Sequence, residues 1–256
     1  SAIPSAADTG FTIDNSCRFS GDANGDEPKL TWTPGSAGTS IQQITASVWV
    51  KRGELGGNQY ILSSGGRWDT GFSFNANDKI TVWVNYAENW RGIETAAIFR
   101  DASAWYHIVA TWDTNNATST DRCIAWVNGV RQAVSWETVM PQGGDTELMN
   151  DKEHTIGMGG RYQYHTRLDA CLAEMNVIDG QVLTPTSFGE TGDYGEWKPK
   201  EYTGTYGDNG FYLDFADSAA LGDDESGNTN DFTANDIDAA DQMLDTPTNN
   251  FATLNP

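Results

Sequence analysis

The sequence predicts an all-β protein built from antiparallel strands, and two neighbouring runs carry most of that prediction. Residues 105–113 and 123–132 are both rich in β-branched and aromatic side chains, which favour strands. Residues 114–121 between them are only Thr, Asn, Ala, Ser and Asp, and Asn128-Gly129 places a tight turn inside the second run. Runs of this kind joined by polar turns are typical of hairpins.

Further strand candidates recur along the chain with turn residues between them, and a helical period is almost absent. They are residues 11–20, 29–33, 44–52, 59–64, 71–74, 79–85, 154–158, 170–178 and 211–215. About a dozen short strands punctuated in this way indicate a sandwich or a barrel. Residues 75–78, Asn-Ala-Asn-Asp, are a suitable hairpin turn between two of them.

Two of the predicted strands show clear alternation. In residues 44–50 aliphatic side chains occupy every second position, and Trp49 lies among the polar residues of the other face. Residues 80–85 repeat the pattern with Trp83 on the polar face. We expect the aliphatic faces to meet in the core between two sheets. A tryptophan on the opposite face predicts a second, partly covered surface.

The C-terminal part of the chain has a different composition. From about residue 202 it is rich in Gly, Asn and Asp, and the only helical pattern covers residues 236–244, before Pro247. We therefore expect residues 1–200 to form the sandwich. Residues 201–256 are expected to pack on it as an appendage with one strand, an Asp/Asn/Gly-rich loop and a short helix.

Composition excludes some classes of function. The chain has 36 acidic and 15 basic residues, a net charge of −21, so it should repel nucleic acid and anionic membranes. No apolar run approaches the roughly 20 residues of a membrane span, which predicts no membrane insertion. The first residues lack the basic and apolar regions of a signal peptide, which predicts assembly in a cytoplasm.

The three cysteines, Cys17, Cys123 and Cys171, show no CxxC spacing. An odd count of single cysteines within apolar runs predicts buried free thiols and folding in a reducing compartment.

Five segments occur in a recognisable order: residues 45–51, 105–113, 126–129, 154–157 and 172–180. With this order the chain resembles the laminin-G-like, concanavalin A-like jelly roll, from about residue 11 to its end. Within that superfamily it is most similar to modules of bacteriophage virion proteins, a narrower resemblance carried by residues 99–107, 206–215 and 245–251. The resemblance implies a two-sheet antiparallel jelly-roll sandwich, and it supplies no catalytic set.

The resemblance implies a non-enzymatic virion surface protein, a fibre or capsid decoration that acts in assembly or host adhesion. Its partners would be other virion proteins or copies of itself in an oligomer, and its location the virion surface after assembly in the bacterial cytoplasm. The alternative is a lectin module that binds a host-surface glycan. A glycoside hydrolase is disfavoured: Asp169 and Glu174 lie an odd number of positions apart, so a regular strand would point these carboxylates to opposite faces.

Loop aromatics beside arginine are the candidate ligand-binding residues, since sugars are held by aromatic faces and planar polar groups at the rim of a rigid scaffold. They are Trp68, Trp90, Arg161, Tyr162, Tyr164 and His165. The alternative is that each aromatic closes its own loop against the sandwich. No catalytic residue is predicted. The three histidines lack zinc spacing, and we expect His107, in the middle of a strand, to be structural.

One acidic loop carries the oxygen ligands that calcium prefers. The candidate ligands are Asp223, Asp224, Asn228 and Asp231, around a glycine. Their spacing is not that of an EF-hand. The sequence favours the alternative, a turn in which Asx side chains satisfy backbone amides, and no cofactor is expected.

Overall fold

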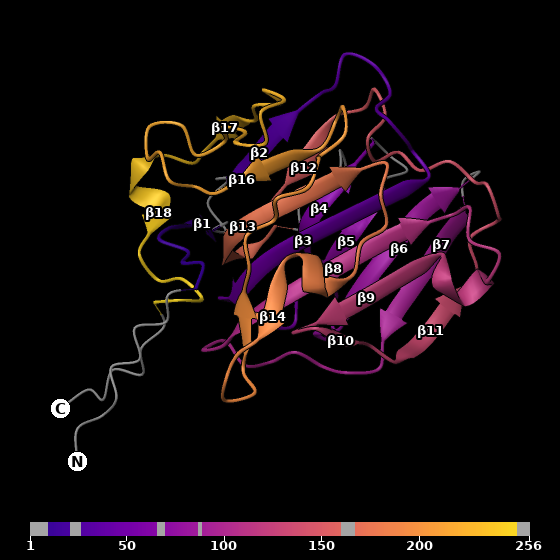
Figure 1. The fold of residues 1–256 in the computed structure, drawn as a ribbon, viewed down its shortest axis with the longest axis horizontal. Helices are drawn as coiled ribbons and strands as arrows, with labels where there is room; N and C mark the ends of the chain where they lie inside the picture. The colour runs from indigo at the N-terminus through magenta and orange to yellow at the C-terminus, as the bar shows by residue number, and fades with distance from the viewer. Residues whose placement is uncertain (1–9, 21–26, 66–69, 87–88, 160–166, 250–256) are drawn as a thin grey trace.

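The chain forms a sandwich of two antiparallel sheets (Figure 1). The structure, a computed structural model, describes residues 10–20, 27–65, 70–86, 89–159 and 167–249. Within these ranges the strands carry nearly all of the regular structure, and the helices are short 3₁₀ turns. The predicted fold class is confirmed.

Sheet A has the spatial order β10-β9-β8-β3-β13-β1-β18, and β16 also pairs with β13. Its strands are β1 (Ser16–Ser20), β3 (Gln43–Arg52), β8 (Trp105–Asp113), β9 (Cys123–Val127), β10 (Val130–Arg131), β13 (Asp169–Asp179), β16 (Phe211–Leu213) and β18 (Gln242–Met243). The longest pairing joins β3 to β8, in register from Gln43 opposite Asp113 to Lys51 opposite Trp105.

Sheet B has the spatial order β11-β7-β6-β5-β4-β12-β2-β17. Its strands are β2 (Lys29–Trp32), β4 (Gln59–Ser64), β5 (Thr70–Phe74), β6 (Ile80–Tyr86), β7 (Asn89–Thr95), β11 (Val134–Thr138), β12 (His154–Ile156) and β17 (Thr233–Asn235). A separate hairpin of β14 (Gly189–Thr191) and β15 (Trp197–Pro199) lies outside both sheets.

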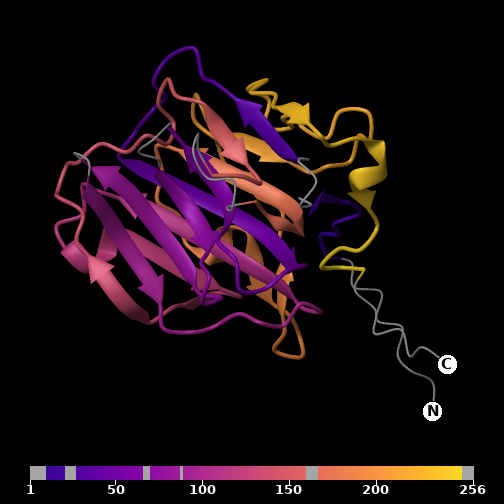
Figure 2. The same ribbon diagram turned by 180° about the vertical axis from the view of Figure 1, so that it is seen from behind.

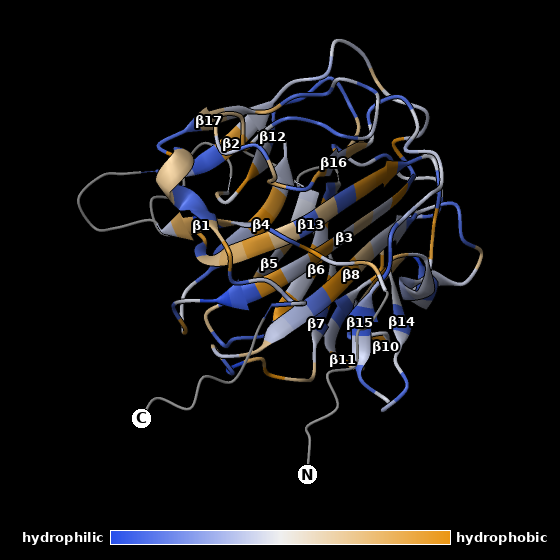
Figure 3. Cartoon of the chain, turned by 60° about the vertical axis from the view of Figure 1, so that its left-hand side comes forward, coloured by the Kyte–Doolittle hydropathy of each residue, from blue (hydrophilic) through white to orange (hydrophobic). Residues whose placement is uncertain are grey.

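The core lies between the two sheets, where apolar side chains from alternate positions meet. Val48 of β3 and Val82 of β6 are both fully buried in it, as the alternation predicts. Figure 3 shows apolar residues concentrated along the central strands of sheet A, while the connecting loops are largely hydrophilic. Burying alternate faces fixes strand register, because a shift of one residue would expose the whole apolar set.

A second layer covers the outer face of sheet A. The β14–β15 hairpin and the chain after it lie in front of this sheet in Figure 1. Trp49 packs there with Trp105 and partly buried Trp197, and a neighbouring cluster forms around Phe188. The covered second surface predicted from Trp49 is therefore confirmed.

His107 is buried under this second layer as a neutral side chain. Its Nδ1 accepts a hydrogen bond from Trp197 Nε1 over 2.9 Å, so its Nε2 carries the proton and donates to Ser47 Oγ at 2.8 Å. Burial lowers the pKa of His107 to about 3. The expected structural role of this histidine is confirmed.

Replacing Trp197 with Phe is expected to lower the free energy of unfolding by about 1–3 kcal/mol, because it leaves His107 Nδ1 buried without a donor. Urea unfolding at pH 7 measures the change. The Tyr194→Ala variant, at the exposed turn of the same hairpin, is the control and should stay within about 0.5 kcal/mol. A neutral Trp197→Phe result would show that the hydrogen bond does not hold the hairpin.

The C-terminal segment contributes more strands to the sandwich than expected. It supplies three strands, β16, β17 and β18, which pair with β13, β2 and β1. The predicted helix at residues 236–244 is wrong. A 3₁₀ turn of three residues, Ala239–Asp241, is closed by a capping box between Asp238 and Asp241, and the chain then enters β18 because pairing with β1 prevails over local propensity. The division at residue 200 stays a prediction.

The cysteines are free, as predicted. Cys17 and Cys123 are buried and Cys171 is half-buried. Burial raises the pKa of all three thiols, so none is activated as a nucleophile. Among the described helices, none has the length and apolar character that crossing a membrane requires.

Candidate functional site

The outer face of sheet B has no hairpin over it comparable to β14–β15 in the described part of the chain (Figure 2). Its composition follows from strand alternation. Since Phe72 and Val82 point into the core, their neighbours Gly71, Ser73 and Trp83 point outward. This outer face is where we locate the candidate site.

An aromatic stack stands at the middle of this face. The ring of Trp90, on β7, stacks on Trp83 of β6 with centroids 5.2 Å apart and planes 14° apart. Tyr60, on β4, meets Trp83 edge-on at 4.8 Å. Trp83 is thereby almost fully buried, while Trp90 remains 44% exposed. An indole supported from below and open above is a rigid platform for an apolar ligand face.

Glycines flank Trp83 on both neighbouring strands. In register, Gly71 of β5 and Gly92 of β7 lie on either side of it. A Cβ at Gly71 would collide with the Leu62 carbonyl, and one at Gly92 with that of Val82. The neighbouring strands therefore carry no side chain beside the indole.

Asn85 lies beside the platform with its hydrogen-bonding groups unused. It is opposite Trp90 in the β6–β7 pairing and only 7% exposed. Neither its Nδ2 nor its Oδ1 has a hydrogen-bond partner among the residues that the structure describes. A buried unsatisfied amide costs about 1–3 kcal/mol, so its presence in a folded protein needs an explanation. This donor and this acceptor lie beside the aromatic platform, and neighbouring atoms cover both of them.

A second exposed indole lies further along the same face. Trp136 of β11 is opposite Glu94 of β7, four residues from Trp90 along the strand. The four residues from Trp90 to Glu94 correspond to about 13 Å along β7 at the usual strand rise. Lys79 and Asn75 hold the Glu94 carboxylate with bonds of 2.9 and 2.8 Å. The Lys79 hydrogen bond is the main reason that the pKa of Glu94 lies below its ordinary value.

Of the predicted ligand-binding residues, the structure places Trp90 in this site. The others, Trp68, Arg161, Tyr162, Tyr164 and His165, lie outside the described residues. Trp83, Asn85, Tyr60 and Trp136 were not among the candidates. The alternation in β6 held a usable signal, because it put a tryptophan and an asparagine together on the non-core face.

The acidic loop around Asp224 is a hydrogen-bonded turn. The Asp224 carboxylate accepts from the backbone nitrogens of Tyr212, Ser226 and Asn230 at 2.8–2.9 Å. Asp231 accepts from Asp224 N, and Asn228 donates to the Gly207 and Gly210 carbonyls. In the described residues no three His, Cys, Asp or Glu side chains are grouped as metal ligands require. The loop therefore forms the Asx-rich turn that the sequence favours.

The family model that matches the chain describes the concanavalin A-like lectin/glucanases superfamily, and the match covers residues 24–187, more than half of the sequence. The chain belongs to this superfamily. Lectins and glucanases both use this fold, so membership directs attention to carbohydrate without assigning an activity. No relative was found among curated protein sequences.

A solved structure of another protein shows the same fold. A putative carbohydrate binding protein from Bacteroides ovatus matches with a TM-score of 0.60 and 15% identity, covering 93% of this chain and 62% of that one. The chain thus spans less than two thirds of that protein. A heptameric SAP-like pentraxin from Limulus polyphemus matches with a TM-score of 0.49 and 19% identity, covering 67% and 78% of the two chains.

Proposed function

We propose that this superfamily member is a non-catalytic carbohydrate-binding module whose site is the outer face of sheet B. The observation that carries the proposal is the exposed indole of Trp90, stacked on Trp83 beside the buried carboxamide of Asn85, which has no partner among the described residues. A pyranose stacked on Trp90 would place ring hydroxyls next to Asn85, whose buried carboxamide they would reach once the atoms that cover it move aside. Such a contact supplies what the folded chain lacks at this point, an acceptor and a donor.

The arrangement favours an extended, neutral glycan. The two exposed indoles, Trp90 and Trp136, are separated by more than one sugar ring, so an oligosaccharide is needed to touch both. The net charge of −21 disfavours sulfated or sialylated chains through long-range repulsion. We therefore expect affinity to rise with chain length among neutral oligosaccharides.

The Trp90→Ala variant is expected to lose about tenfold or more in glycan affinity, because it removes the stacking surface. A glycan array identifies the ligand, and calorimetry with the best neutral oligosaccharide gives the dissociation constants. The Tyr194→Ala variant removes an aromatic that is 85% exposed on the β14–β15 turn and should bind as the wild type. Equal binding by all three proteins would refute the site, and retention of acidic glycans alone would refute the neutral class.

An Asn85→Leu variant separates a binding role from a structural one. Replacing an unpartnered buried amide with an apolar group of similar size should leave the melting temperature unchanged or raise it, because a desolvation cost is removed. Glycan binding should be lost at the same time. A lower melting temperature with intact binding would mean that Asn85 serves the fold.

We further propose, from the sequence resemblance alone, that the module acts on a virion surface, where glycan binding would attach the particle to its host. Copies of this chain or other virion proteins would then be its neighbours. Labelled protein that fails to decorate purified particles, and forms only monomers by light scattering, would count against this placement. Release of reducing sugar from a polysaccharide panel would overturn the non-catalytic assignment.

A further inference from the structure

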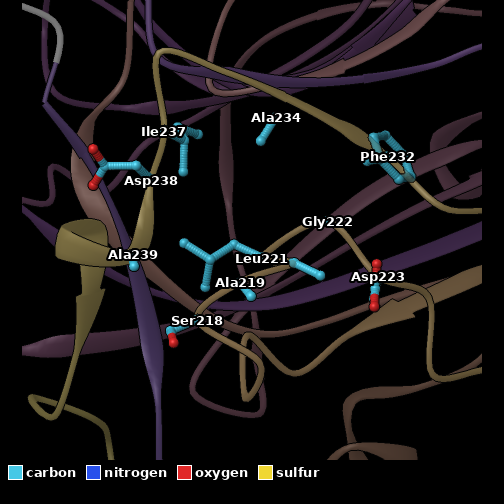
Figure 4. A pocket seen from close by; sticks show the side chains of 11 residues that line it. Ser218, Ala219, Leu221, Gly222, Asp223, Phe232, Ala234, Ile237, Asp238 and Ala239 are labelled. Carbon is cyan, nitrogen blue, oxygen red and sulfur yellow. The ribbon is translucent and has the colours of Figure 1, made fainter.

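A pocket of about 420 Å³ opens in the C-terminal segment, beside β17 at the edge of sheet B (Figure 4). Two stretches of chain form it, residues 218–223 and 232–239. Its floor is apolar, with Leu221 in the centre of the view between Ile237 and Phe232. Cavities of this size bind small ligands, and they can also take one side chain of another protein together with the residues next to it.

The walls are fixed by contacts that need no ligand. Phe232 N donates to the Gly222 carbonyl at 2.8 Å, which joins the two stretches. The Phe232 ring packs on Phe211 at 4.7 Å and on Trp32 at 5.7 Å. The pocket is therefore formed before anything enters it, which lowers the cost of binding.

Two carboxylates lie at opposite sides of the opening, Asp238 and Asp223 (Figure 4). The Asp238 carboxylate already has a hydrogen-bond partner, since it accepts from Ala240 N at 2.8 Å. Asp223 accepts no hydrogen bond and joins no ion pair with the described residues. Desolvation, and then the negative charges of Asp231 and Asp217, raise its pKa. A cation at this position would relieve that repulsion.

The surroundings offer no cation from the same segment. Residues 201–256 contain twelve Asp and Glu and not one Lys or Arg. This segment holds more than half of the chain's net charge of −21. The field at the pocket is thus strongly negative and draws basic groups from solution.

We propose that this pocket binds a lysine side chain presented by a partner protein. The four-carbon stem would lie on Leu221, Phe232 and Ile237, and the ammonium group would meet the free carboxylate of Asp223. Lysine fits better than arginine, because one free carboxylate suits a compact point charge, whereas a guanidinium favours a bidentate partner. The inference is independent of glycan binding.

Nuclear magnetic resonance on the ¹⁵N-labelled full chain tests the proposal with N-acetyl-lysine methylamide as the probe. The amides of Leu221, Gly222, Phe232 and Ile237 should shift with a dissociation constant of order millimolar. N-acetyl-norleucine methylamide has the stem without the charge and should shift them much less. Raising the salt concentration should weaken binding of the lysine probe.

Variants locate the effect. Asp223→Asn should weaken binding of the lysine probe by up to about fivefold, and Ala234→Leu should abolish it by filling the pocket. Glu225→Gln removes a nearby charge that does not line the pocket and is the matched control, expected to bind nearly as the wild type. Trp90→Ala should also bind normally, which separates this test from that of glycan binding. Equal shifts with norleucine, no effect of either pocket variant, or shifts caused by calcium chloride but not by lysine would overturn the proposal.

Discussion

The Asp78→Asn variant is expected to lose about 3 kcal/mol of unfolding free energy, the lower end of the cost of breaking a buried ion pair. Its partner Arg52 has a side chain with 0% exposure, and the two meet at 3.0 Å. The Arg52 guanidinium lies over the Phe74 ring at 4.2 Å. Removing the negative charge leaves this cation in the core without compensation.

Asp78 also connects three loops at one end of the sandwich through hydrogen bonds. It accepts from Gly56 N and from Arg100 Nε, both at 2.7 Å, and its own carbonyl accepts from Phe99 N. Burial alone would raise the pKa of Asp78, but the hydrogen bonds from Arg100 and Gly56 and the nearby Arg52 hold the pKa below its ordinary value. Asn is chosen because the residue has a φ of 59°, a conformation that Asn tolerates better than Ala.

Urea unfolding of the purified chain at pH 7 measures this loss. The control is Asp121→Asn, which breaks the exposed pair between Asp121 and Arg131 and should cost less than about 1 kcal/mol. A second variant, Arg52→Met added to Asp78→Asn, should recover part of the loss because it removes the uncompensated charge. Equal costs for Asp78→Asn and Asp121→Asn would contradict a buried ion pair.

The strands that the sequence predicts well are those with strong alternation or a clear turn. Residues 105–113 are β8 with the predicted bounds, and β9 and β10 flank the turn at Asn128-Gly129 as expected. The strands that were missed lack such patterns. β7 begins with two exposed residues and contains Gly92, β11 is largely exposed at a sheet edge, and β17 and β18 are short pairings fixed by distant strands.

The candidate site was predictable only in part, because its members come from different strands. Trp90 was predicted as a loop aromatic next to Arg91; it lies instead in strand β7, because residues 89–95 pair with β6. Its support by Trp83 depends on the β6–β7 register, and the lack of a partner for Asn85 depends on the whole three-dimensional neighbourhood. Sequence alternation gives the face on which a side chain lies, but it cannot say which polar groups remain unsatisfied.

The environment of Glu174 is a further feature that the sequence alone does not indicate. β13 is interrupted there by a bulge between Ala173 and Asn176, and Glu174 takes a φ of 49°. The bulge breaks the regular alternation used to judge Asp169 and Glu174, and it turns Glu174 toward β16. Its Oε1 accepts from Tyr212 OH at 2.9 Å. Glu174 is thus a buried carboxyl that a tyrosine hydroxyl holds within the fold.

Burial raises the pKa of Glu174 to about 8, against the lowering effect of the Tyr212 hydrogen bond, with Asp214 and Glu201 raising it further. The folded chain therefore keeps this carboxyl protonated at neutral pH, while the unfolded chain ionises it near pH 4.5. Because the folded state binds the extra proton, its contribution to stability is complete below pH 4.5 and is lost as the pH rises to about 8.

A Glu174→Gln variant removes this dependence while keeping an acceptor for Tyr212. Relative to the wild type, its unfolding free energy should rise by about 1.4 kcal/mol per pH unit between pH 4.5 and 8, to a total of about 4 kcal/mol. Buried His107 and His154, whose pKa values are lowered to about 3 and 4, impose the opposite slope below pH 6.5. That slope is common to both proteins and cancels in the difference. Tyr212→Phe keeps the carboxyl and should retain the wild-type slope, whereas parallel curves for Glu174→Gln and wild type would show that Glu174 is already ionised in the fold.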